Sequence, residues 1–341
     1  MIPQPAFCGS LCRRSALLAV LGSIVLGLAG CATGGAAPPK ASDLQVHGML
    51  STIELAPLHY AIAYLDAAQD PVQHGGIPNL FQGSRFNPAT DADLAGHADT
   101  QALRESLKHP NLRIILTITE GHYRIVAKRS AGIRSLADLK GKRVAMIEET
   151  SAHFYLDRLL RTAGMDGDAD VEIVSLQRPH DSAATLLDGR ADALAMWEPE
   201  TELAVEKLGR DAIILSGDAN YNELYNLHTT AEKLANAETR AKMVGFVASL
   251  IEASQAIQKN PEPAIELVAE AMQYPLADVQ ASWPHHEFVT SLSPALLDTL
   301  VAEEAWLAKR AGREPRGREQ LATLIDPSIE AEARQLLASR R

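Results

Sequence analysis

Short apolar runs alternate with amphipathic segments along most of this 341-residue chain. Residues 44–50 have the apolar content of a strand, and residues 56–68 follow with helical spacing and with Pro57 suited to a first helical turn. Further strand-like runs occupy residues 92–95, 111–119, 123–128, 143–147, 171–176, 191–197 and 212–217. Since helical patterns separate several of these runs, the sequence predicts an α/β fold with parallel sheets.

The pattern changes in the last third of the chain. From Ala231 onward almost every segment has helical spacing, and the breaks coincide with Pro261, Pro275, Pro284 and Pro294. We therefore expect a helical C-terminal part.

The first 31 residues differ from the rest. Two arginines precede an uncharged apolar run, residues 15–30, which is shorter than the ~20 residues needed to span a bilayer and ends in small residues. Its end, LAGC, resembles the lipobox of bacterial lipoproteins, which implies cleavage before Cys31 and a lipid on its sulfur. We predict a signal peptide at 1–30 and a flexible tether at 31–43. An uncleaved anchor is the alternative, and both Sec and Tat export remain open.

This signal predicts an exported protein, held on the periplasmic or cell-surface face of a membrane by its lipid. Cys8 and Cys12 fall inside the predicted signal peptide, so the mature chain would keep only Cys31. A single lipidated cysteine leaves no internal disulfide and no thiol for catalysis or zinc binding.

Composition and motifs narrow the function classes. The net charge of −11 and the pI near 5.5 would repel phosphate backbones, so we expect no nucleic-acid partner. The chain contains no GxSxG, HExxH or phosphate-loop motif, and the HHE cluster at 285–287 is too compact to hold a metal without help. We therefore expect neither an enzyme nor a bound metal or cofactor.

Residues 90–100 and 189–201 resemble each other weakly. Each places Ala-Asp at the start of a small-residue strand, then a loop and an acid–Thr pair that could open a helix. Chance is the alternative in an alanine-rich chain. Otherwise the similarity indicates two lobes that each turn a strand end toward a shared cleft, where ligands of open α/β sheets bind.

Residues 131–165 carry the most informative motif. Their elements SLADLKGKRVA and TSAHFYL resemble a signature of bacterial ABC-importer solute-binding proteins, in the branch that binds sulfonates, taurine, nitrate and thiamine precursors. Residues 188–200, DGRADALAMWEPE, resemble that branch's second-lobe strand with its Trp-acid-Pro loop. Residues 120–133 and 225–230 resemble its two crossings between lobes.

The resemblance implies a two-lobe type II periplasmic binding protein, each lobe a mostly parallel sheet flanked by helices. The first lobe would be discontinuous, 44–121 plus 223–335, and the second would be 122–222. Such a protein is expected to be a monomer that captures a small organic solute and delivers it to an inner-membrane permease, which an ATPase drives.

Several alternatives remain open. A lipoprotein that senses a ligand would have the same features. The solute could be an anion such as a sulfonate, an amino-sulfonate, or a neutral heterocycle, such as a thiamine pyrimidine precursor, stacked on Trp197. The resemblance also includes an enzyme of thiamine synthesis, but its cysteine-rich motif is missing here.

The stretch EETSAHFYL, residues 148–156, joins a predicted strand to a predicted helix. Thr150 and Ser151 would either cap this helix or, with its free N–H groups and dipole, bind an anionic part of the solute. The resemblance favours ligand binding. The predicted ligand-binding residues are Glu54, Gly76, His97 and Asp99 in the first lobe, Glu120 and Asn226 near the hinge, and Thr150, Ser151, His153, Trp197 and Glu198 in the second lobe.

Overall fold

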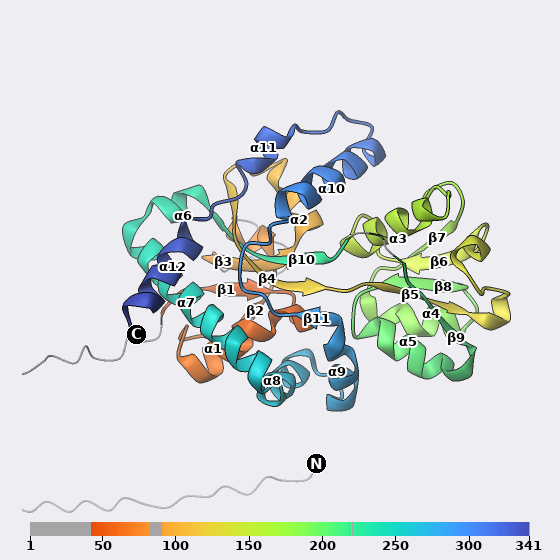
Figure 1. The fold of residues 1–341 in the computed structure, drawn as a ribbon, viewed down its shortest axis with the longest axis horizontal. Helices are drawn as coiled ribbons and strands as arrows, with labels where there is room; N and C mark the ends of the chain where they lie inside the picture. Colours follow the sequence, from red (N-terminus) through yellow and green to blue (C-terminus); the bar gives the residue numbers. More distant parts are fainter. Residues whose placement is uncertain (1–41, 82–90, 218, 220, 341) are drawn as a thin grey trace, which may run out of the picture. The chain divides into compact units, whose positions relative to one another are not determined.

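The computed structural model describes residues 42–81, 91–217, 219 and 221–340. The predicted signal peptide, Cys31 and all but the last two residues of the predicted tether lie outside them. Within the described part, the strands form two sheets. Figure 1 shows that the first sheet joins orange and gold segments with teal and blue ones from the last third of the chain, whereas the second is built from the yellow and green middle of the chain.

The first sheet has the strand order β11-β4-β10-β3-β1-β2. Its strands are β1 (Val46–Gly48), β2 (Gln73–His74), β3 (Leu94–Ala98), β4 (Leu112–Gly121), β10 (Glu223–Thr230) and β11 (His286–Glu287). β1 pairs in parallel with β2 and β3, whereas β10 is antiparallel to β3 and β4, and β11 is antiparallel to β4. β4 leads the chain out of this sheet and β10 leads it back, so the two neighbours run in opposite directions.

The second sheet has the order β7-β6-β8-β5-β9. Its strands are β5 (Arg124–Lys128), β6 (Arg143–Met146), β7 (Glu172–Ser175), β8 (Ala193–Met196) and β9 (Ala212–Leu215). β6 is parallel to β7 and β8, but β5 is antiparallel to β8 and β9. In strand direction the sheets are mostly parallel, as expected: β1, β2, β3 and β4 point one way in the first sheet, and β6, β7, β8 and β9 do so in the second. The strands that run against them are β10 and β11 in the first sheet and β5 in the second, so each sheet also contains antiparallel pairs.

Helices flank both sheets (Figure 1). They are α1 (Ala56–Leu65), α2 (Asp99–Ser106), α3 (Ser151–Thr162), α4 (Ser182–Leu187), α5 (Glu200–Leu208), α6 (Ala231–Ala235), α7 (Ala237–Lys259), α8 (Glu262–Met272), α9 (Leu276–Ser282), α10 (Leu296–Arg310), α11 (Arg318–Ala322) and α12 (Ser328–Ser339). The helical C-terminal part is confirmed, with Pro261 and Pro275 as the N-cap residues of α8 and α9. Among the described residues, no helix combines the length and apolarity needed to cross a membrane.

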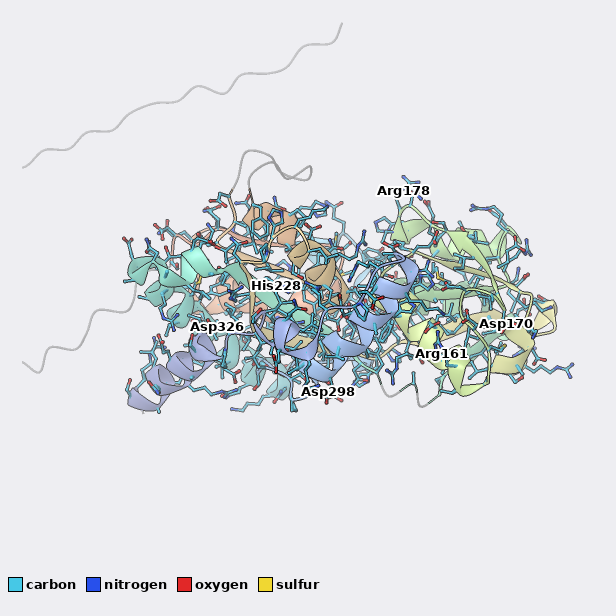
Figure 2. The ribbon with its side chains drawn as sticks, turned by 90° about the horizontal axis from the view of Figure 1, so that it is seen from above. Arg161, Asp170, Arg178, His228, Asp298 and Asp326 are labelled. Carbon is cyan, nitrogen blue, oxygen red and sulfur yellow. The ribbon has the colours of Figure 1, made fainter. Side chains whose placement is uncertain are left out.

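The eight predicted strand runs are confirmed as β1 and β3 to β9. The strands of the second sheet all lie between Arg124 and Leu215, and those of the first lie before or after that range. Figure 2 shows the same division from above: His228 on β10 lies among first-sheet elements, and Arg161 in the last turn of α3 lies on the side of the second sheet. Only short connections at Gly121–Arg124 and Leu215–Glu223 lead directly from one sheet to the other.

Apolar side chains cover both faces of the first sheet. On one face Leu116 and Leu227 pack in a cluster with Phe246 of α7, and on the other face Ile114 packs in a cluster with Leu300 of α10. Each fully buried side chain of this size contributes about 1.5–3 kcal/mol relative to an exposed one. This packing fixes the strands whose ends reach the candidate site.

Candidate functional site

A cavity of about 490 Å³, counting its open mouth, is lined by segments of both sheets. Five predicted residues line it: Glu54, His97, Thr150, Ser151 and Trp197. Glu54 lies in the 3-10 helix η1 (Ile53–Leu55) after β1, His97 lies near the end of β3, and Trp197 directly follows β8. Strand ends and helix starts therefore converge here, as ligand sites of open α/β sheets do.

The two similar stretches of sequence both end at this cavity. In the first, β3 is followed by α2, which begins at Asp99. In the second, β8 is followed by α5, which begins at Glu200. His97 and Trp197 occupy the corresponding strand ends, and both line the cavity.

The start of α3 differs from an ordinary capped helix. Thr150 is the N-cap residue, but no side chain caps the first turn, because its hydroxyl donates to the carbonyl of Ile147 at 2.8 Å. The Ser151 hydroxyl instead lies 3.1 Å from Oε1 of Glu223 and 2.9 Å from the hydroxyl of Tyr123. Capping therefore does not explain either hydroxyl, and Ser151 links the second sheet to β10 of the first.

Glu54 and Glu223 form a buried acidic pair at the cavity wall, with 2% and 5% of their surface exposed. Burial and the negative charge of Glu54 raise the pKa of Glu223 well above its ordinary value, which favours the protonated form of this carboxyl group. Burial alone would raise the pKa of Glu54, but the hydrogen bond and charge of His286 outweigh burial and lower it. His286 Nε2 lies 3.6 Å from Glu54 Oε1.

His97 is a half-buried imidazole whose pKa favours the neutral form. Burial and the charge of Arg104 lower the pKa of His97 to about 4, and its Nδ1 accepts a hydrogen bond from the backbone N–H of Ala98 at 2.8 Å. Gly76 lies behind this ring rather than in the cavity lining, since a Cβ there would come within 2.9 Å of His97 Cδ2. Gly76 thus allows the ring to pack closely, and the structure does not place it in contact with the cavity.

Asp99, Glu120 and Asn226 do not line the cavity. Asp99 accepts hydrogen bonds from the backbone N–H groups of Thr100 and Leu224, and burial raises its pKa to about 6. Glu120 accepts from Ser293 Oγ at 2.9 Å, and fully buried Asn226 is held by Thr117 and Leu224. These three side chains tie the first sheet to its neighbours.

His153 and Glu198 also lie outside the cavity lining. His153 is fully buried, accepts from the backbone N–H of Glu149 at 3.2 Å, and meets the ring of Trp306 edge-on at 5.1 Å. Glu198 pairs with Arg124 at 2.9 Å. Both side chains contact protein groups outside the cavity: Nε2 of His153 lies 3.7 Å from Asp168 and has no hydrogen-bond partner in the described structure.

The predicted ligand-binding residues did not include eight lining residues, namely Met49, Thr52, Ala98, Thr100, Gln101, Glu149, Glu223 and Tyr225. Thr100 and Gln101 could have been found, because they form the first turn of a predicted helix directly after a predicted strand. Glu149 lies within the stretch 148–156 that drew attention for its hydroxyls. No local pattern marked Glu223, which lies in a strand with all eight residues buried.

A second hollow of about 900 Å³ lies beside Glu120, Tyr123 and Tyr221. Within the described residues, none of its lining side chains has a buried polar atom without a partner, whereas the first cavity has three such side chains. We therefore take the smaller cavity as the candidate site. No described cluster of histidines and acids is arranged to hold a metal ion.

A profile of the protein family described as “NMT1/THI5 like” matches residues 87–264 of the chain. The chain is also similar to a protein of Escherichia coli (strain K12) named “Putative aliphatic sulfonates-binding protein”, with 31% identity over 170 residues. That match covers 50% of this chain and 51% of the relative, so the chain spans about half the length of the curated relative it matches.

Solved structures share the fold at low sequence identity. The alkanesulfonate-binding protein SsuA from Xanthomonas axonopodis pv. citri, bound to MOPS, gives a TM-score of 0.65 at 20% identity, over 85% of this chain and 99% of that chain. The desulfurization enzyme DSZB, in a complex with biphenyl-2-sulfinic acid, gives a TM-score of 0.61 at 15% identity. That match covers 86% of this chain and 99% of the enzyme's chain. The predicted fold class is confirmed, and because this fold serves both a binding protein and an enzyme, it does not decide between them.

Proposed function

We propose that this chain, which belongs to the NMT1/THI5-like family, is the solute-binding component of an ABC importer. The observation that carries the proposal is the cavity, whose walls come from both sheets and whose buried side chains present polar atoms without a partner in the described structure. Small-molecule sites commonly have this concave form with a few converging polar groups.

The proposed lobes are residues 44–121 plus 223–335 and residues 122–222, with the solute between them. Ion pairs bridge the lobes on the described surface: Arg104 lies 3.7 Å from Glu149, and Arg310 lies 3.5 Å from Glu148. A solute that binds the closed arrangement more tightly than the open one would draw the lobes together. The residues proposed to contact it are Glu54, His97, Thr150, Ser151 and Trp197.

The proposal includes the protein's place in the cell. Export, a lipid on Cys31 and a monomeric state would place the binding lobes beside the permease, with the ATPase acting through that permease. The name of the Escherichia coli relative makes aliphatic sulfonates the first solute class to test.

The test is a binding screen on the purified chain by native mass spectrometry and thermal unfolding. Sulfonates, nitrate, pyrimidines, aromatic acids and amines would be offered singly. A solute at 100 times its dissociation constant should stabilise the protein by about 2.7 kcal/mol. Recovery of that solute unchanged supports a binding protein, whereas its conversion to a product would identify an enzyme and contradict the proposal.

A mutant control separates cavity binding from surface binding. Trp197→Ala alters the cavity wall, while Trp283→Ala changes a tryptophan that lines a different hollow near α9. The proposal requires the first variant to weaken binding much more than the second.

A further inference from the structure

The cavity that we propose for the solute has an acidic lining. Three carboxyl side chains line it, those of Glu54, Glu149 and Glu223, and no lysine or arginine is among its described lining residues. Glu149 has a nearby cation, since Arg104 lies 3.7 Å away and both side chains are more than 40% exposed. The charge that distinguishes this cavity therefore comes from the buried pair, Glu54 and Glu223.

Each member of this pair has one oxygen that the protein leaves without a hydrogen-bond donor. Oε2 of Glu54 and Oε2 of Glu223 are both buried and unpartnered in the described structure. The other oxygens are used, because Glu54 Oε1 faces His286 and Glu223 Oε1 faces the Ser151 hydroxyl. The two carboxyl groups lie within hydrogen-bond reach of each other, so without a ligand a shared proton is what these two oxygens have for a partner in the described structure.

The remaining polar atoms help to define that partner. The Ser151 hydroxyl lies between two protein groups, Glu223 and Tyr123, and Thr150 donates to the backbone, so neither hydroxyl is held ready for an anion. The indole Nε1 of Trp197 is the one buried lining donor without a partner in the described part. The site thus offers two acceptor oxygens and one indole donor.

We propose that the solute of this site carries a protonated nitrogen group, an ammonium, amidinium or guanidinium, whose N–H donors bind Oε2 of Glu54 and Oε2 of Glu223. This inference rests on the proposed function and specifies its substrate class. The nitrogen group replaces the proton that two adjacent carboxyl groups otherwise hold between them. A solute with no nitrogen leaves the two carboxyl groups to share that proton and gains no contact with either oxygen, whether or not it also carries a sulfonate.

The test uses solutes that differ only in the nitrogen group. Taurine is compared with ethanesulfonate, and propylammonium with 1-propanol, by calorimetry on the full chain. Any solute recovered in the broad screen is compared with its analogue lacking nitrogen. We expect the nitrogen-bearing member to bind at least tenfold more tightly, and Glu54→Gln to remove that advantage.

Two further variants keep the test decisive. Glu223→Gln is used if Glu54→Gln fails to fold. Glu287→Gln is the control, because it removes an exposed carboxylate next to His286 that does not line the cavity. The nitrogen advantage should persist in the control.

The possible outcomes separate this inference from the proposed function. Equal or tighter binding of the nitrogen-free members, or a bound solute with no protonated nitrogen, overturns the inference and leaves solute binding intact. A nitrogen advantage that survives in both Glu54→Gln and Glu223→Gln also overturns it. If no solute of any class binds, the proposed function fails and the inference fails with it.

Discussion

The hydroxyl of Ser151 lies 3.1 Å from Oε1 of Glu223, although the two residues are 72 positions apart in the sequence. Ser151 is the first residue of α3 beside the second sheet, and Glu223 is the first residue of β10 in the first sheet. A single hydrogen bond at the cavity wall therefore joins the two halves of the proposed binding protein.

Ser151→Ala should weaken this junction. The variant leaves Oε1 of buried Glu223 without its donor, which costs about 1–3 kcal/mol of unfolding free energy. Urea unfolding measures this loss, and calorimetry with the best solute measures affinity. Thr162→Ala is the control, because its hydroxyl, at the other end of α3, donates to the Leu159 carbonyl and does not line the cavity. Unchanged affinity in Ser151→Ala would show that the hydroxyl has a structural role alone.

Trp197→Ala and Trp306→Ala should have different effects. Trp306 is 6% exposed and packs with Phe154 and His153, so its loss should destabilise the protein by about 3–5 kcal/mol. Trp197 covers the cavity and should matter more for affinity, with a loss of tenfold or more. Thermal unfolding and solute titration of both variants give the comparison, and a Trp197 variant with full affinity would contradict it.

Asp99 should make stability fall as the pH rises. Burial raises its folded pKa from 3.8 to about 6, so between these values the folded state keeps a proton that the unfolded state loses. A shift of this size corresponds to about 3 kcal/mol. Urea unfolding of wild type and of Asp99→Asn at a series of pH values gives the difference between their free energies of unfolding. This difference, wild type minus variant, should decline from pH 4 to pH 7. A flat difference would mean that Asp99 ionises as readily in the folded chain as in the unfolded one.

Glu304 should be among the most sensitive acidic residues for stability. Its fully buried carboxylate lies 2.6 Å from Arg313 Nη1 and 2.9 Å from Arg316 Nη2. Burial would raise its pKa, but hydrogen bonds from these arginines lower it to about 2. Glu304→Gln should cost about 3–5 kcal/mol at neutral pH. In wild type this contribution is lost as pH falls from 4.5 through about 2.

An exposed ion pair provides the control for Glu304. Arg318 and Asp298 are both more than half exposed, so Arg318→Ala should change stability by at most about 1 kcal/mol. Equal losses in the two variants would show that burial does not decide the effect.

Cys31 should carry a lipid in the mature protein. Mass spectrometry of the membrane fraction should find a diacylglycerol group on an N-terminal Cys31, and Cys31→Ser should abolish both the lipid and this cleavage. Recovery of wild-type protein that still begins at Met1 would favour the uncleaved anchor.

Local patterns were enough to predict most of the strands, because a short apolar run such as Val144–Ile147 can be recognised without knowing which elements it packs against. β10 was recognised only as a crossing, since burial on both sides leaves Glu223, Asn226 and His228 without the alternation that marks an exposed strand. Its polar side chains contact residues far away in the sequence, namely Ser151, Thr117 and Ala95, which no local pattern reveals.

The candidate site shows the same limit. Ser151 and Trp197 follow predicted strands closely, so their position at the cavity could be inferred from the sequence. His153 could have been set aside, because two residues along a helix turn the side chain by about 200°, away from the face of Ser151. Glu223 required knowledge of which strand lies beside which.

The position of β10 between β3 and β4 has a consequence for how the chain is made. Synthesis proceeds from the N-terminus, so β3 and β4 are made early. β10, which lies between them in the sheet, is made only after all the strands of the second sheet. The five-stranded sheet can thus be complete while the six-stranded one still lacks its central member. Closure of a loop of about 100 residues then limits assembly of the first sheet, a slow step for long-range pairing. During that interval β3 and β4 are open edges, exposed to other chains.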